Sequence, residues 1–102
     1  MIREYQKPLQ AYTINSNLIP EVSESNLESF LDTLSGGNIF FFQVATAAAV
    51  QIGLPNARYT GIYHRYADGL QNLIFFPISD DTKVYKKYRT SASTPWSSWI
   101  SG

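Results

Sequence analysis

TKVYKKYRTSASTPWSSWI, residues 82–100, combines a strand-like alternation of aromatic and basic residues, a polar turn and two tryptophans three positions apart. Large aromatic side chains bury the most area per residue and dominate both protein cores and contact surfaces. Tyr85, Tyr88, Trp96 and Trp99 therefore belong to a core, to a contact surface or to both. The chain upstream is predicted to form the sheet that this segment closes.

Residues 82–89 are predicted to form a strand in which Val84 and Tyr88 alternate with Tyr85, Lys87 and Arg89. Successive strand side chains point to opposite faces, and the apolar set normally faces the core. We therefore expect the even-numbered side chains to point inward and the odd-numbered ones outward.

Residues 90–94 are predicted to form a polar loop, and Pro95 suits the start of an edge strand. By alternation Trp96 faces the core beside Val84 and Tyr88, whereas Trp99 faces outward. The predicted ligand-binding face, a stacking platform for a sugar ring or a neighbouring chain, consists of Tyr85, Lys87, Arg89 and Trp99. The alternative is that Trp99 is a partly exposed aromatic residue that protects a sheet edge.

A β-hairpin is predicted directly upstream. Two strand-length runs, residues 59–67 and 70–78, are separated by Asp68-Gly69, a dipeptide that suits a type I′ turn. A second turn is expected at residues 79–81.

NIFFFQV, residues 38–44, is predicted to be a central strand covered on both faces, because it is apolar and favours β structure. Residues 45–57 combine small residues with glycine and proline, which predicts a loop or crossover. A helical turn at residues 46–50 is an alternative within it.

A short helix is predicted at residues 26–35. Ser25 and Glu28 form an S-x-x-E capping box, and Gly36-Gly37 ends the run. The apolar stripe of this helix consists of Leu27, Phe30, Leu31 and Leu34. The predicted fold class is therefore α+β, mainly β, with an antiparallel meander of about four to five strands and one short helix packed on it.

Residues 1–24 are predicted to form an extended arm, and residues 25–102 the domain. The arm contains two prolines and scattered apolar residues without a sustained period. It is either a disordered leader or a segment that lies on a neighbouring chain.

The composition excludes several classes of function. The chain has 102 residues, 8 basic and 8 acidic residues, and no cysteine. A net charge of zero argues against general binding of nucleic acid or membrane surfaces, and the lack of cysteine excludes disulfides and thiolate chemistry. No secretion signal or membrane span is predicted.

The sequence predicts no catalytic, cofactor or metal site. His64 is the only histidine, lies within a strand and has no second ligand at metal spacing, so we interpret it as structural. Asp80 and Asp81 suit a solvated turn, with a hard cation as the alternative. A possible basic patch is either a soluble face or an anion-contacting surface, and it consists of Lys83, Lys86, Lys87 and Arg89.

Several motifs follow one another along the chain: Leu54-Pro55 in the crossover, Gly61-Ile62 opening a strand, Gln71 early in the next, residues 85–89, and W-S-S-W with Arg89 seven residues before Trp96. Their order resembles that in the pyocin knob domains of bacteriophage tail fibres and R-type bacteriocin fibres. The likeness covers residues 27–100.

The resemblance implies a non-enzymatic virion module of a tail fibre, baseplate or other appendage. Members of this family sit in trimeric fibres near receptor-binding parts, so a homo-oligomer, with a trimer favoured, and contacts with other phage structural proteins are expected. Binding of a cell-wall carbohydrate is a further expectation, whereas nucleic acid and membrane insertion are not expected. The alternative is a small host-side enzyme or regulatory domain that shares only the sheet.

Overall fold

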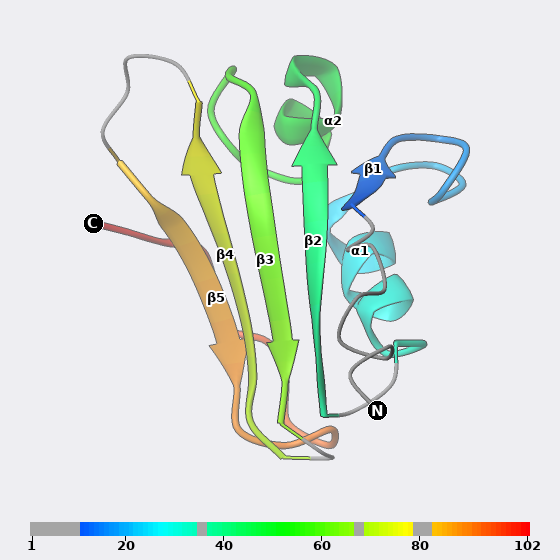
Figure 1. The fold of residues 1–102 in the computed structure, drawn as a ribbon, viewed down its shortest axis with the longest axis vertical. Coiled ribbons are helices and arrows are strands. Elements are labelled where there is room, and N and C mark those ends of the chain that lie inside the picture. Colours follow the sequence, from blue (N-terminus) through cyan, green and yellow to red (C-terminus); the bar gives the residue numbers. More distant parts are fainter. Residues whose placement is uncertain (1–10, 35–36, 67–68, 79–82) are drawn as a thin grey trace, which may run out of the picture.

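A computed structural model of the chain describes residues 11–34, 37–66, 69–78 and 83–102. Its strands form one six-stranded sheet in the order in which they follow one another along the chain (Figure 1). The strands are β1 (Ala11–Ile14), β2 (Asn38–Val44), β3 (Tyr59–Arg65), β4 (Gln71–Pro77), β5 (Tyr85–Arg89) and β6 (Ile100–Ser101). The helices are α1 (Glu24–Leu31) and α2 (Thr46–Gln51).

The sheet is mixed. Strands β2 to β6 pair antiparallel with their chain neighbours, so the predicted meander is confirmed for this part. Strand β1 was not predicted, and it pairs parallel with β2. In its described residues the chain is a small, mainly β domain with two helices.

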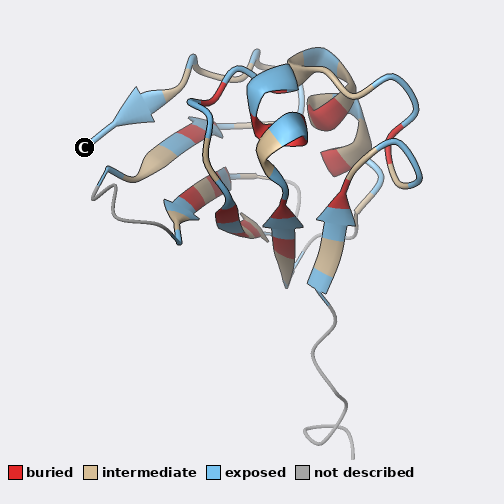
Figure 2. Ribbon diagram, turned by 90° about the horizontal axis from the view of Figure 1, so that it is seen from above, coloured by how far each residue is buried: buried red, intermediate tan, exposed pale blue. Residues whose placement is uncertain are grey.

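Both helices pack on the same face of the sheet (Figure 2). The core lies between them and the sheet, where Leu27 and Leu31 of α1 and Ala48 and Ala49 of α2 are buried. The buried sheet residues of this core are Ile14, Phe42, Val44, Tyr59, Tyr63, Leu73 and Phe75. Neither described helix has the length and apolar character needed to cross a membrane.

Helix α1 begins and ends earlier than predicted. Its N-cap is Ser23, whose Oγ accepts a hydrogen bond from the Asn26 backbone N–H at 3.2 Å, rather than Ser25. Glu28 points to Lys87 on the sheet, so it is not free to complete a capping box with Ser25. The helix ends at Leu31 with Asp32 as its C-cap, before the glycines.

The predicted hairpin is confirmed, because β3 and β4 pair along their whole length. Its turn includes residues 67–68, which lie outside the described residues, as does the turn predicted at residues 79–81. The flanking register nevertheless differs from the prediction. The Tyr66 backbone N–H donates to the Leu70 carbonyl at 2.9 Å, which leaves three residues between these two rather than the pair Asp68-Gly69.

Strand β2 is central, but only one of its faces is covered. Phe42 and Val44 are buried, whereas Ile39 on the opposite face is exposed. The apolar run therefore does not require a second layer, and the prediction of cover on both faces is wrong for the described part of the chain.

The described part of the predicted arm belongs to the fold. Residues 11–14 form an edge strand, and Ile14 and Ile19 are buried in the core. The predicted boundary between residues 24 and 25 therefore falls inside a packed region, within the first turn of α1. Residues 1–10 lie outside the described residues.

Candidate functional site

The predicted faces of strand β5 are inverted in the structure. Lys87 and Arg89 are only 1% and 7% exposed, whereas Tyr88 is 46% exposed. The prediction fails because it assumed that cations stay in water, although a charged side chain can be buried when it is paired. Tyr85 and Trp99 also pack against the core, so the predicted outward platform is not formed.

Lys87 is held between helix α1 and the C-terminal segment. Its ammonium group forms ion pairs with Glu24 and Glu28, the latter at 2.9 Å. On another side it lies 4.5 Å from the centre of the Trp99 ring, which is cation–π geometry. The charge of this lysine is therefore compensated within the fold.

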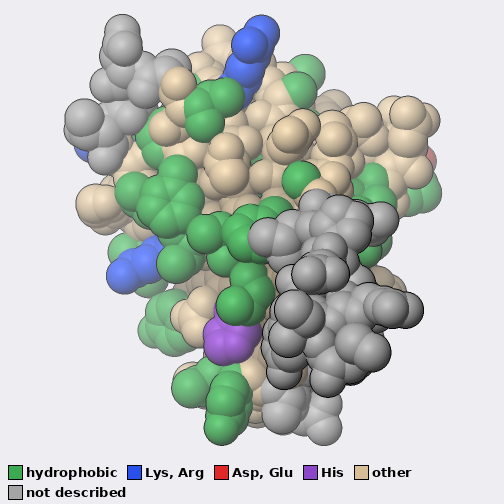
Figure 3. Space-filling model, viewed as in Figure 1, with side chains coloured by type: hydrophobic (Ala, Val, Ile, Leu, Met, Phe, Trp, Pro, Cys, Tyr) green, Lys and Arg blue, Asp and Glu red, His purple; other side chains and the backbone are tan. Residues whose placement is uncertain are grey.

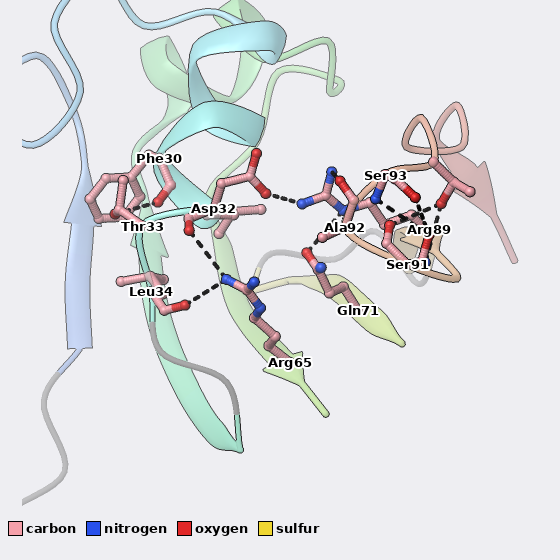
Figure 4. A network of polar contacts seen from close by, with 12 residues as sticks. Phe30, Asp32, Thr33, Leu34, Arg65, Gln71, Arg89, Ser91, Ala92 and Ser93 are labelled. Atoms are coloured by element: carbon pink, nitrogen blue, oxygen red, sulfur yellow. Dashed lines mark hydrogen bonds and ion pairs between the residues drawn. The ribbon is translucent and has the colours of Figure 1, made fainter. Parts of the chain in front are cut away.

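Arg89 is the centre of a second polar cluster (Figure 4). Its guanidinium pairs with Asp32, donates through Nε to Gln71 Oε1 at 3.0 Å, and stacks over Trp96 at 5.1 Å. Burial lowers the pKa of Arg89, and the nearby Glu28 carboxylate acts in the opposite direction. An arginine side chain is always charged in proteins, so Arg89 keeps its charge in this cluster.

Tyr63 and Arg65 extend this cluster along β3. The Tyr63 hydroxyl donates to Gln71 Oε1 at 3.0 Å, and burial raises the pKa of Tyr63, although Arg65 opposes this shift. Arg65 donates to the backbone carbonyl of Leu34 at 2.8 Å, beyond the C-terminus of α1 (Figure 4). The cluster therefore docks α1 onto β3, β4 and β5.

A sequence signal for these pairs exists. Glu24, Glu28 and Asp32 are spaced by four, which places them in one row on a helix. Four helical residues rise about 6 Å and two strand residues about 6.6 Å, so this row matches the spacing of Lys87 and Arg89. The three acids lie beside the apolar stripe of α1, where they form ion pairs with Lys87 and Arg89.

Both tryptophans point to the helix-covered side. Trp96 contacts Tyr63 with ring centres 6.3 Å apart, and Trp99 contacts Phe75 at 5.5 Å. The indole N–H of Trp99 also donates to the Ile52 carbonyl at 2.9 Å. The prediction that they face opposite sides is wrong, and so is the placement of Trp96 beside Tyr88, which lies on the other face.

An extra residue in the C-terminal segment explains this arrangement. The Ser97 N–H donates to the Tyr88 carbonyl at 2.8 Å, whereas Ile100 pairs with Lys86. Two steps along β5 thus correspond to three steps along the segment, which is the geometry of a β-bulge. The bulge shifts the alternation by one, so side chains three apart share a face.

The opposite side of the sheet, here called the open face, is not covered by any described helix (Figure 2). Its side chains form three rows across the strands. The first row contains Ile39, His64, Asn72 and Tyr88. The middle row contains Phe41, Ile62, Ile74 and Lys86. The third row contains Gln43, Thr60 and Phe76.

The open face is predominantly apolar. Figure 3 shows hydrophobic side chains gathered around the single histidine. Ile39, Phe76 and Tyr88 are exposed, and the apolar residues of the middle row are half-buried. Contiguous exposed apolar patches of several hundred Å² commonly mark interaction sites. The open face is therefore the candidate functional surface, and the sequence did not reveal it because the apolar run of β2 was assigned to a buried strand.

The remaining predicted sites do not assemble into a single surface. Lys83 and Lys86 are exposed while Lys87 and Arg89 are buried, so the predicted basic patch is not contiguous. His64 is half-buried on the open face, with its ring 6.4 Å from that of Tyr66. Asp80 and Asp81 lie outside the described residues, and within the described ranges no three acidic or histidine side chains group as a metal site.

Comparison with protein-family models, with curated proteins and with solved structures found no match to this chain. The resemblance to pyocin knob domains therefore rests on the sequence motifs alone and stays a prediction.

Proposed function

We propose that the chain is a non-enzymatic structural module of a bacteriophage particle. In this proposal it forms part of a tail fibre, baseplate or other appendage and assembles with copies of itself, as a trimer, and with other virion proteins. The observation that carries the proposal is the apolar open face, on which Ile39, Phe76 and Tyr88 are exposed.

The distribution of charge supports a structural role for the other side of the sheet. Lys87 and Arg89 use their charges to hold α1 through Glu24, Glu28 and Asp32. These ion pairs stabilise the docking of a helix, and the side chains of the two cations are buried. A host glycan is therefore not assigned to them, and we assign the contact with a neighbouring chain to the open face.

The sequence motifs add the virion context. The order of Gly61-Ile62, Gln71, Arg89 and W-S-S-W resembles pyocin knob domains, which sit in trimeric fibres. Ile14 and Ile19 of the predicted arm do not supply a contact with a neighbouring chain, because both are buried within the chain itself. The open face takes their place as the apolar surface that a neighbour would cover.

Purified phage particles test the virion assignment. Mass spectrometry of gradient-purified virions, produced by bacteria that carry the phage encoding this chain, should detect it in constant ratio to the major tail proteins. Detection only in the soluble fraction of the lysate, with none in washed virions, would instead favour a small host-side enzyme or regulatory protein.

Sedimentation equilibrium of the purified chain tests self-association separately. We expect a mass that rises with concentration toward three copies. A constant mass of one copy at all concentrations would refute the oligomer while leaving the virion assignment to the mass spectrometry.

A further inference from the structure

We infer that the open face packs against the open face of a second copy of the chain. This inference rests on the proposed self-association and names the surface that forms it. In a dimer two open faces meet, and in a trimer each open face turns toward the common axis. Three properties favour a second copy as the partner: the charge of the open face, its area and the short edge strands of the sheet.

The charge of the open face suits an identical partner. Its three rows contain no carboxylate, and Lys86, on β5 near one edge, is their only lysine or arginine. The acidic residues of the described ranges lie instead on α1 or beside it: Glu21, Glu24, Glu28 and Asp32. A partner with a charged surface would find no opposite charge at the centre of the face. A second open face brings apolar side chains against apolar side chains and leaves no charge buried at the centre.

The area is sufficient for a specific contact. Strand β1 extends the rows by one strand, and strands β1 to β5, spaced about 4.8 Å apart with four to seven residues each that rise about 3.3 Å, outline a face of roughly 500 Å². Two such faces cover about 1,000 Å² together, which reaches the lower bound for a specific protein interface. Protruding side chains add to this area, so contact between the faces can hold two copies together.

The edges of the sheet favour contact through the face. Edge strand β1 has four residues and edge strand β6 has two. Short edge strands offer few backbone groups to another chain, which limits edge-to-edge pairing. Association through the face requires neither edge and covers the exposed side chains of Ile39, Phe76 and Tyr88.

The absence of cysteine makes this surface directly measurable, because one introduced thiol is the only thiol in the chain. Ile39 on the open face and Val50 on α2 are 57% and 54% exposed, so Ile39→Cys and Val50→Cys form a matched pair. In dilute solution both thiols should react with an aromatic disulfide reagent at similar rates. At high protein concentration the Ile39→Cys thiol should react at least about tenfold more slowly, as mass action fills the interface, while the Val50→Cys rate stays constant.

Charge insertion provides the second arm of the test. Ile74→Lys places an ammonium group in the middle row, and Val50→Lys places one on the helix side. We expect Ile74→Lys to raise the dissociation constant of the oligomer more than about tenfold, because like charges would meet in a desolvated contact. Val50→Lys should leave it unchanged, and circular dichroism of both variants confirms that the sheet is retained.

The outcomes separate the inference from the proposed function. An oligomer that withstands Ile74→Lys and leaves the Ile39→Cys thiol reactive overturns the inference alone, since the copies then meet elsewhere. A monomeric chain that is nevertheless present in virions, with the Ile39→Cys thiol protected there, also overturns it, because another virion protein then covers the face. A monomer that is absent from virions overturns both.

Discussion

The ammonium nitrogen of Lys87 lies 4.5 Å from the centre of the Trp99 ring, on the inner side of the sheet. Glu24 and Glu28 of α1 approach the same nitrogen from the helix layer. The lysine side chain is fully buried, while the two carboxylates are 43% and 28% exposed. Water can therefore replace the lysine as partner of the acids, but nothing among the described residues can replace the acids as partners of the lysine.

Lys87→Met is expected to change the free energy of unfolding by less than about 1 kcal/mol, because apolar replacement of a buried ion pair is often neutral or stabilising. The double variant Glu24→Gln/Glu28→Gln should lose about 3 kcal/mol, because it leaves a buried ammonium group without carboxylate partners. Urea unfolding at neutral pH measures both. A Lys87→Met variant that is the less stable of the two would show that the ion pairs of Lys87 stabilise the fold more than an apolar side chain at this position does.

Gly61→Ala is expected to cost about 1 to 3 kcal/mol through overpacking. Gly61 pairs with Phe75 on the neighbouring strand, and a Cβ at position 61 would overlap the Phe75 ring, with its nearest atom at only 2.0 Å. That ring cannot move freely, because Tyr59 and Trp99 pack beside it. Thermal unfolding measures the loss, and the double variant Gly61→Ala/Phe75→Leu should show a smaller loss relative to Phe75→Leu alone.

Ser23→Ala is expected to destabilise the chain by about 1 kcal/mol, because it removes the side chain that caps α1. Ser23 Oγ accepts the Asn26 backbone N–H, whereas Ser25 lies within the first turn of the helix. Ser25→Ala is the matched control and should change stability by less than about 0.5 kcal/mol. Equal losses in chemical denaturation would instead support the capping box predicted from the sequence.

The sequence predicted the meander because its signals are local. Alternation and turn residues act over a few positions, and the β3–β4 hairpin follows from them. The direction in which β5 faces is not a local property. Lys87 and Arg89 are buried because α1, more than fifty positions away, supplies Glu28 and Asp32 at matching spacing.

The open face could not be predicted from the sequence for a related reason. An apolar run such as residues 38–44 is compatible with a strand covered on one face or on both, since the pattern of apolar residues does not show how many layers pack on the sheet. The bulge after Ser97 could not be predicted either, because the extra residue between the Ser97–Tyr88 and Ile100–Lys86 pairs depends on how two strands pair. It nevertheless reverses the predicted direction of Trp99.

Alkaline pH is expected to destabilise the chain partly through Tyr63. Burial raises the pKa of Tyr63 in the folded chain above its usual value, although Arg65 acts in the opposite direction. The stability that this shift contributes is fully present below the unfolded pKa and is lost as pH rises through the folded pKa, because the unfolded chain releases the proton first. Unfolding free energies measured from pH 8 to pH 11 should fall less steeply in Tyr63→Phe than in the unchanged chain.

Tyr66 provides the control for this pH dependence. It is exposed, so Tyr66→Phe should leave the alkaline slope unchanged. At neutral pH Tyr63→Phe should cost about 1 kcal/mol, because it removes the hydrogen bond to Gln71. An alkaline slope that is the same in Tyr63→Phe and Tyr66→Phe would argue against the raised pKa as its cause.

The two tryptophans are expected to contribute to the same layer but to differ in hydrogen bonding. Trp96→Ala and Trp99→Ala should each cost about 3 kcal/mol, because both indoles pack on the core and cover a buried cation. Replacing each tryptophan by phenylalanine distinguishes the two positions, since phenylalanine keeps an aromatic ring but lacks the indole N–H. The Trp99 N–H donates to the Ile52 carbonyl, whereas the buried Trp96 N–H has no partner among the described residues. Thermal unfolding should therefore show that Trp99→Phe lowers the free energy of unfolding by about 1 kcal/mol more than Trp96→Phe does. The reverse order would mean that the hydrogen bond to Ile52 does not hold the C-terminal segment in place.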